Sequence, residues 1–202
     1  METERRTRLA PDERHAQLVA LGVASLVDRP LEALTIDYLA AQAGVSRGLL
    51  FYYFGSKQGL HREVVRTARD SMLRATEPAR MMPPLDRLRD TLSRIVQFVR
   101  DHEGTFYSLV RGVAAGDTEV RAVMEEARAQ QAERLVAVFL ELGVADSPLL
   151  RIALRSWVAF AEEVIVETAI GSDMPSSEIV SFLERSARAV VASIEPALAV
   201  RS

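Results

Sequence analysis

TIDYLAAQAGVSRGLLFYYFGSKQGL, residues 35–60, reads as two short helices about a turn, followed by the start of another helix. Thr35 and Ser46 are suitable N-caps, because each hydroxyl can accept a hydrogen bond from an unpaired backbone N–H. Gly44 can adopt the positive φ that the turn requires. Helices of about eight residues are unstable alone, so a neighbouring helix must bury their inner faces. The stretch predicts a helix-turn-helix, and its spacing alone leaves open whether it binds DNA or forms a generic helical hairpin.

Apolar residues recur at intervals of three and four along the rest of the chain, without a convincing run of β-type alternation. We therefore expect an all-α protein of about nine helices. Pro78, Pro83 and Pro84 form the strongest break between them. The expected units are an N-terminal helix-turn-helix domain at 1–55, a connecting helix at 56–76 and a C-terminal helical bundle at 77–202. The expected helices span 11–27, 35–43, 46–53, 57–76, 85–102, 104–114, 117–142, 148–170 and 176–198.

The composition is ordinary for a globular protein, and the lack of cysteine is compatible with a reducing cytoplasm. The 202 residues are 49% apolar and 26% charged, with a net charge of −3 and no cysteine. The first 69 residues carry ten Lys and Arg against eight Asp and Glu, so the basic part is the N-terminal third. No apolar run approaches the ~20 residues of a membrane-spanning helix, and the charged start lacks the apolar core of a secretory signal. We expect a cytoplasmic protein.

One set of residues matches a known signature without gaps from about residue 18 to residue 60. The matching positions are Thr35, Leu39-Ala40, Ala43-Gly44-Val45-Ser46, Gly48, Leu50, Tyr53-Phe54, Ser56-Lys57 and Leu60. In these positions the chain resembles the tetracycline-repressor (TetR) family of bacterial transcriptional regulators. The close match covers about a quarter of the chain. The helix count and length of the remainder are similar to the family's C-terminal ligand-binding and dimerisation domain.

The resemblance implies that helix 46–53 enters the major groove, where base edges present a distinct pattern of donors and acceptors. Arg47 would fork onto guanine or clamp a phosphate, Gly48 would let the helix approach closely, and Leu49 would offer an apolar contact. The family commonly has Tyr where this chain has Phe51, so one hydroxyl that could reach phosphate is missing. The implied DNA-binding set is Thr35, Ser46, Arg47, Gly48, Leu49, Phe51, Tyr52, Tyr53 and Lys57.

Lys57 is the only lysine among the 25 basic residues. A cation in the first turn of a helix opposes the helix dipole, which favours anions there by ~0.3–1 kcal/mol. A bound phosphate would remove the conflict, because the ammonium group and the backbone N–H groups after Ser56 would form one anion site. The alternative is a solvated lysine that tolerates a small penalty. We therefore predict a phosphate contact at Lys57.

The last two long helices are the expected dimer interface. A single helix-turn-helix contacts only a few base pairs, so two copies on a two-fold, inverted-repeat operator are expected. The resemblance implies the same arrangement, with these helices and their symmetry mates forming a four-helix interface. The alternative is that their apolar residues line the core of one protomer. The expected interface residues are Leu150, Leu154, Trp157, Val158, Ala161, Ile165, Ile179, Phe182, Leu183 and Val190.

Aromatic and polar residues of the C-terminal half could wall a cavity between helices. Each also has a plain explanation as core packing. His102 and Tyr107 could fix a polar group of a ligand, and Arg111 could neutralise an acidic one. The apolar majority predicts a hydrophobic or amphipathic small molecule as effector. The candidate pocket residues are Phe98, His102, Phe106, Tyr107, Arg111, Met124, Phe139, Trp157 and Phe160.

Catalytic, metal and cofactor sites are not predicted. The Glu-x-x-His motif of helical di-metal sites is missing, and the three histidines are scattered. Glu162 and Glu163 are adjacent, so they cannot face the same way as an acid and base pair. The leading hypothesis is a homodimeric repressor that a small molecule releases from its operator. The alternatives are a DNA-binding dimer without an effector and a helical protein–protein interaction module that does not bind DNA.

Overall fold

The computed structural model describes residues 10–106 and 118–195, and every regular element among them is helical. Two short segments supplement the α-helices: a 3-10 turn, η1, at Leu31–Ala33, and a π-helical segment, η3, at Val166–Ile170. The all-α prediction is confirmed. None of the described helices is long and apolar enough to cross a membrane. The α-helices are α1 Pro11–Ser25, α2 Ile36–Ala43, α3 Arg47–Phe54, α4 Lys57–Ala75, α5 Pro84–Asp101, α7 Thr118–Glu141, α8 Pro148–Ile165 and α9 Ser176–Ile194.

Helix ends differ from the sequence expectations by small amounts. The helix expected at 11–27 ends at Ser25, whose hydroxyl donates to the carbonyl of Leu21 in the last turn. The helix expected at 148–170 is α-helical to Ile165 and continues as η3. Of the helix expected at 104–114, residues 104–106 are described and helical, and the rest lies outside the described residues.

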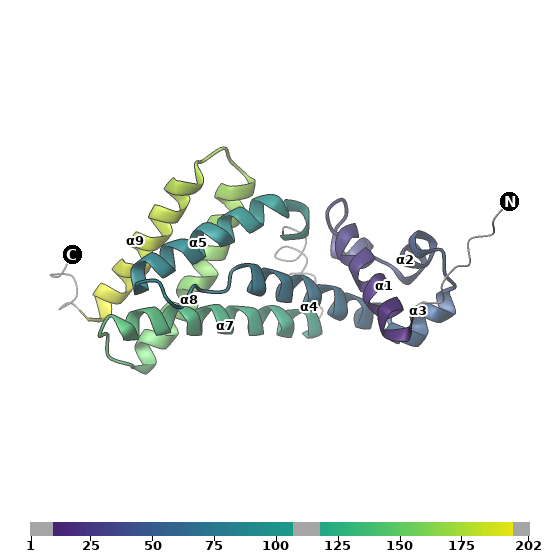
Figure 1. Ribbon diagram of the computed structural model, residues 1–202, viewed down its shortest axis with the longest axis horizontal. Helices are drawn as coiled ribbons and strands as arrows, with labels where there is room; N and C mark the ends of the chain where they lie inside the picture. The colour runs from purple at the N-terminus through teal and green to yellow at the C-terminus, as the bar shows by residue number, and fades with distance from the viewer. Residues whose placement is uncertain (1–9, 107–117, 196–202) are drawn as a thin grey trace.

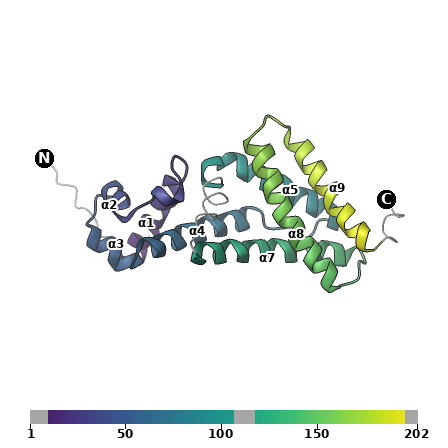
Figure 2. The ribbon, with the colours of Figure 1, turned by 180° about the vertical axis from the view of Figure 1, so that it is seen from behind.

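The first three helices form a compact head at one end of the molecule, and α4 leads from this head into the larger helical domain (Figure 1). Along that path α4 lies beside α7. Seen from behind, α8 and α9 face the viewer together on the side away from α4 (Figure 2). The head and the larger domain are therefore joined by α4 and by the adjacent part of α7.

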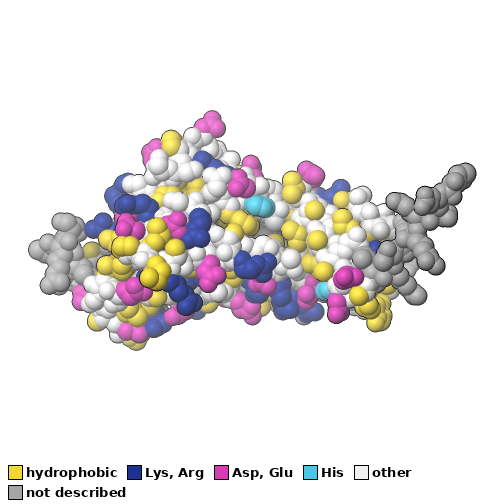
Figure 3. All heavy atoms as spheres, in the orientation of Figure 1, with side chains coloured by type: hydrophobic (Ala, Val, Ile, Leu, Met, Phe, Trp, Pro, Cys, Tyr) yellow, Lys and Arg dark blue, Asp and Glu magenta, His cyan; other side chains and the backbone are white. Residues whose placement is uncertain are grey.

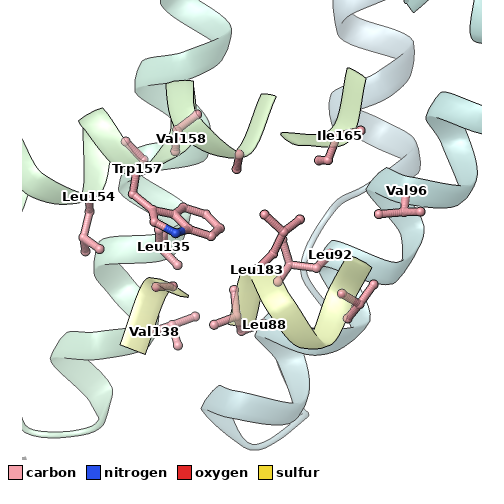
Figure 4. Close-up of a cluster of buried hydrophobic side chains, with 14 of the residues drawn as sticks. Leu88, Leu92, Val96, Leu135, Val138, Leu154, Trp157, Val158, Ile165 and Leu183 are labelled. Atoms are coloured by element: carbon pink, nitrogen blue, oxygen red, sulfur yellow. The ribbon is translucent and has the colours of Figure 1, made fainter. Parts of the chain in front are cut away.

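Two apolar cores stabilise this arrangement. The core of the head contains the fully buried side chains of Leu18, Leu39, Leu50 and Leu60. It also takes in Val120, Val123 and Met124 from the first turns of α7. The second core lies among α5, α7, α8 and α9, and Figure 4 shows the indole of Trp157 pointing from α8 into its centre. Helix α7 therefore contributes side chains to both cores and packs against the head as well as the larger domain.

Candidate nucleic-acid interface

The helix-turn-helix is fixed by local hydrogen bonds. Thr35 Oγ1 accepts from the backbone N–H of Tyr38 at 3.1 Å, and Ser46 Oγ accepts from that of Leu49 at 3.3 Å. Gly44 ends α2 in the left-handed conformation, with φ 63°. Each cap satisfies a backbone donor that the helix leaves unpaired. Both hydroxyl hydrogens remain available to donate to a phosphate oxygen, so the caps and the expected phosphate contacts are compatible.

One face of α3 is buried and the opposite face is exposed. Leu50 and Phe54 pack into the core of the head, whereas Phe51 is 46% and Tyr52 77% exposed. Arg47 and Gly48 lie on the same exposed face, since they precede Phe51 and Tyr52 by four residues each. Figure 3 shows a group of hydrophobic side chains at the lower right, where α3 lies in Figure 1. We call Arg47, Gly48, Phe51 and Tyr52 the α3 face.

Arg47 has a partner that the sequence analysis did not identify. Its Nε lies 2.6 Å from Oδ1 of Asp37 on α2, and both side chains are more than 60% exposed. An ion pair at such a position contributes only ~0–1 kcal/mol, so DNA could displace it at little cost. Until then Asp37 holds the guanidinium beside the start of α3. The acidic residue was visible in the sequence, but its pairing depends on how α2 crosses α3.

Lys57 also has a partner that was not expected. Its Nζ donates to the backbone carbonyl of Glu32 in η1 at 2.6 Å, which links the start of α4 to the turn before α2. The side chain of Lys57 is therefore held by a hydrogen bond, unlike the purely solvated lysine that the sequence left open. An ammonium group has three donors, so a phosphate could still bind while this contact persists.

The remaining residues of the expected DNA-binding set surround the α3 face. Tyr53 is half-buried, with its ring centroid 5.6 Å from that of His15 on α1 and 5.2 Å from that of Tyr52. Leu49 is also half-buried. Around Gly48 there is ample space: a Cβ added there would meet nothing nearer than Ser46 Oγ at 3.9 Å. Glycine is thus not required at this position by the packing of the protein itself.

A cavity of about 240 Å³ lies among α4, α5, α7 and α8. Most of its wall is apolar. Phe98, His102, Phe106, Met124 and Trp157 line it, as the sequence analysis expected. The head contributes to it as well, because Val23 of α1 and Ala68 of α4 also lie on the wall. This contribution was not predicted, since it depends on the packing of α1 and α4 against the larger domain.

Two of the expected pocket residues lie elsewhere, and two cannot be placed. Phe139 packs in the second core rather than on the cavity wall. Phe160 points outward from α8 and is 43% exposed. Both expectations are corrected, because aromatic spacing does not distinguish the sides of a helix that is apolar on several faces. Tyr107 and Arg111 lie outside the described residues.

Charged groups also reach the cavity wall. Arg128 Nε on α7 lies 2.7 Å from Glu162 Oε2 on α8, and both residues line the cavity. Burial raises the pKa of the Glu162 carboxyl, and the charge of Arg128 opposes part of that rise. His102 stands at the end of α5, stacked on Phe98 with ring centroids 4.3 Å apart. The wall is thus apolar with a few polar groups of defined orientation.

The expected dimer interface needs correction, because most of its residues are buried within one protomer. Phe182 is 43% exposed and Val190 is half-buried. The other expected interface residues fit the alternative given above, in which the apolar residues of α8 and α9 line the core of one protomer. These core residues are Leu150, Leu154, Trp157, Val158, Ala161, Ile165, Ile179 and Leu183.

The outer side of α8 and α9 carries a different apolar set. Leu149 and Ile152 are 59% and 64% exposed, and Phe160 lies 6.1 Å from Phe182 between ring centroids. The α8 residues share one side of their helix by their spacing. We call Leu149, Ile152, Phe160 and Phe182 the outer face. Adjacent large apolar side chains on a surface are typical of an interface.

Comparison with known families assigns the chain to a class. A model of the bacterial regulatory proteins of the tetR family matches residues 18–64, and a model of the tetracyclin repressor-like C-terminal domain matches residues 84–195. The second match covers more than half of the chain. The protein therefore belongs to the tetR family of bacterial regulatory proteins, as the helix-turn-helix and the helical domain behind it indicated.

The curated relatives are transcriptional regulators rather than enzymes. The chain is 31% identical over 109 residues to the HTH-type transcriptional activator FasR of Mycolicibacterium smegmatis, a match that covers 52% of this chain and 49% of FasR. It is 38% identical over 56 residues to the HTH-type transcriptional regulator EthR of Mycobacterium tuberculosis, covering 28% of this chain and 26% of EthR. The chain thus spans about half the length of the first relative and a quarter of the second.

Solved structures share the whole architecture. A tetR-family transcriptional regulator from Streptomyces coelicolor superposes with a TM-score of 0.80 at 26% identity, over 95% of this chain and 87% of that chain. A TetR transcriptional regulator from Rhodococcus sp. RHA1 superposes with a TM-score of 0.62 at 21% identity, over 96% and 100% of the two chains. The second similarity, at this identity, concerns the fold alone.

Proposed function

We propose that the protein is a one-component transcriptional regulator that binds an inverted-repeat DNA operator as a homodimer in the bacterial cytoplasm. The observation that carries the proposal is the α3 face. A capped, short helix presents Arg47, Gly48, Phe51 and Tyr52 to solvent while Leu50 and Phe54 anchor it in the core of the head. A helix held in this way suits insertion into the major groove.

In this proposal the residues around the α3 face divide the work. Arg47 reads a base, because its fork geometry matches the acceptors of guanine. Gly48 and Leu49 allow close approach and an apolar contact, with Phe51 packing on a sugar or a thymine methyl. The hydroxyls of the two caps and of Tyr52 and Tyr53, together with Lys57, hold phosphates and fix the register.

The outer face is proposed as the interface between two copies. A helix-turn-helix dimer must place its two reading helices about 34–36 Å apart, or a multiple of this, so the interface must lie far from the reading head. Helices α8 and α9 satisfy that requirement (Figure 2). An isologous contact would set Phe160 and Phe182 of one protomer against the same surface of its partner.

The cavity supports control by a small molecule rather than a dimer without an effector. A ligand there would touch Val23 and Ala68 of the head side as well as the larger domain. By preferring one arrangement of the two domains, it would shift the spacing of the paired reading helices. We propose that the effect is release from the operator, and therefore repression in its absence. The alternative of a helical protein–protein interaction module without DNA binding lacks a comparable structural feature.

Titration against DNA from the gene's own upstream region, at several salt concentrations, tests this function. Binding should be tight for one sequence and should weaken steeply as salt rises, because released counterions drive phosphate contacts. Affinity that responds to neither sequence nor salt would overturn the proposal.

A further inference from the structure

Arg134 on α7 differs in its partners from the other arginines of the cavity wall. It donates to two backbone carbonyl oxygens, those of Leu73 at 3.1 Å and Thr76 at 3.3 Å. Among the described residues, no carboxylate lies within ion-pair distance of it. Each of the others pairs with a carboxylate: Arg69 with Glu126, Arg87 with Glu141, and Arg128 with Glu162. Arg134 therefore places on the wall a positive charge that, among the described residues, is not ion-paired with a carboxylate.

Electrostatics support this description. Burial lowers the pKa of the Arg134 guanidinium, the nearby charge of Glu77 opposes the change, and Arg94 adds to it. A partly buried cation is costly unless it is compensated, and backbone carbonyls compensate it less than a carboxylate does. An anion bound beside Arg134 would remove that cost.

Two other polar groups on the cavity wall are also unsatisfied. The Nε2 of Gln131, one turn before Arg134 on α7, has no hydrogen-bond partner among the described residues. The same holds for the hydroxyl of Thr91 on α5, a residue that is more than nine-tenths buried. All three residues line the cavity, and α5 packs against α7. A guanidinium, an amide N–H and a hydroxyl are donors, and an ionised carboxylate accepts several hydrogen bonds while donating none.

Arg134 also closes the end of α4. Leu73 and Thr76 stand in the last turn and at the cap of that helix, where the carbonyl groups carry the negative end of the helix dipole. The same helix begins at Lys57, beside the α3 face. Whatever draws Arg134 away from these carbonyls removes a charged contact between α7 and the helix that leads to the head.

We propose that the cavity recognises an amphipathic organic carboxylate, whose head group binds Arg134 together with Gln131 and Thr91 and whose apolar body lies along Leu88 and Leu135. This inference rests on the proposed effector function and names its ligand class. Binding draws the guanidinium from α4, so ligand recognition and the loosening of α4 are one event. A neutral or cationic ligand would leave the contact between Arg134 and α4 in place.

Trp157 gives a direct measurement, because it is the only tryptophan and lies on the cavity wall. We would titrate the purified protein with decanoate, 1-decanol and decyltrimethylammonium, each below its micelle concentration, and follow Trp157 fluorescence with calorimetry as a second readout. Decanoate should bind at least about tenfold more tightly than decanol, the gain expected of hydrogen bonds to a charged group. Arg134→Gln should abolish this preference while leaving decanol binding unchanged.

Arg69→Gln is the matched control, because Arg69 lies on the same wall but is already held by Asp70 and Glu126. The Arg69→Gln variant should keep the preference for decanoate. Arg134→Lys keeps the positive charge but loses the planar, two-pronged guanidinium, so it should retain part of that preference. Circular dichroism would establish that each variant is folded.

Three results would overturn the inference: equal or tighter binding of decanol or the ammonium probe, an Arg134→Gln variant that keeps the preference, or no binding of any probe. The titration contains no DNA, so its failure is distinguishable from a failure of operator binding. If both the proposed function and this inference hold, decanoate also weakens operator binding of the wild-type protein but not of the Arg134→Gln variant.

Discussion

The head and the cavity domain differ in how they treat buried polar groups. In the head, the buried ring of His61 places Nε2 2.7 Å from the carbonyl oxygen of Leu34, and the helix caps are satisfied. In the described residues, the buried side-chain atoms without hydrogen-bond partners all lie on α5 or α7: apart from a nitrogen of Arg87, which is ion-paired with Glu141, they belong to Thr91, Arg94 and Gln131. The buried His61 of the head has a hydrogen-bond partner, whereas the cavity domain keeps unsatisfied donors inside.

This difference suits the two regions to different proposed functions, DNA binding by the head and ligand binding by the cavity domain. Reading base edges requires a rigid element, and a fully packed core provides that rigidity. Binding a ligand requires groups whose hydrogen bonds are completed only when the ligand arrives, and such groups lower the stability of the empty domain.

Phe182→Glu on the outer face should produce monomers, because two carboxylates would meet in an isologous contact. Operator affinity should fall by about 100-fold or more, since two linked heads bind far more tightly than one. Sedimentation and DNA titration of the same sample would measure both. Asp173→Ala, in the exposed turn before α9, is the control. A Phe182→Glu variant that remains a dimer would contradict the assignment of the interface.

Leu50→Ala should destabilise the protein by about 3–5 kcal/mol, because Leu50 is fully buried in the core of the head and does not border the cavity. Leu88→Ala should cost about 2 kcal/mol, since Leu88 already borders the cavity and its removal only enlarges an existing space. Urea unfolding of both variants would compare them. Equal losses, or a larger loss at Leu88, would show that the two cores do not differ in packing as described.

Arg47→Ala and Lys57→Ala should weaken DNA binding in different ways. Arg47→Ala should relax the preference at one base pair by about 1–3 kcal/mol. Lys57→Ala should weaken binding to all sequences. It should also reduce the slope of log affinity against log salt concentration by about one, the loss of one phosphate contact. Titrations with single-base variants of the operator would distinguish these effects. Identical behaviour of the two variants would refute the division between base reading and phosphate binding.

Gly48→Ala should stabilise the isolated protein by about 0.5–1 kcal/mol, because alanine favours a helix and the space beside Gly48 is open. The same change should weaken operator binding if the helix approaches base edges at this position. Thermal unfolding and DNA titration of one preparation would give both numbers. A variant that gains stability and keeps full DNA affinity would remove Gly48 from the proposed interface.

The features that sequence reasoning could predict depend on contacts within a few residues. The caps at Thr35 and Ser46 and the turn at Gly44 involve neighbours three or four positions away, so residue type alone indicates them. The contact of Lys57 with Glu32 spans 25 residues, and its geometry depends on the crossing of η1 and α4. Local chemistry therefore located the helix-turn-helix but not the partners of Arg47 and Lys57.

The same limit applied to the larger domain. Helix α8 has apolar residues on several sides, so the sequence could not distinguish Leu154, which is fully buried, from Phe160, which faces outward. The sequence did not indicate the partners of Arg134 either, because they are the carbonyl groups of Leu73 and Thr76, about sixty residues earlier. Which face of a helix meets which neighbour is decided by tertiary packing.

The central claim is that the α3 face contacts DNA, and the absence of cysteine from the chain allows a direct test. Single-cysteine variants Phe51→Cys, on that face, and Asp173→Cys, in the exposed turn before α9, would be labelled with a maleimide with and without saturating upstream DNA. DNA should slow labelling at position 51 by at least about tenfold and leave position 173 unchanged, because a residue in the groove is shielded from reagent. Equal labelling rates at position 51 with and without bound DNA would contradict the account.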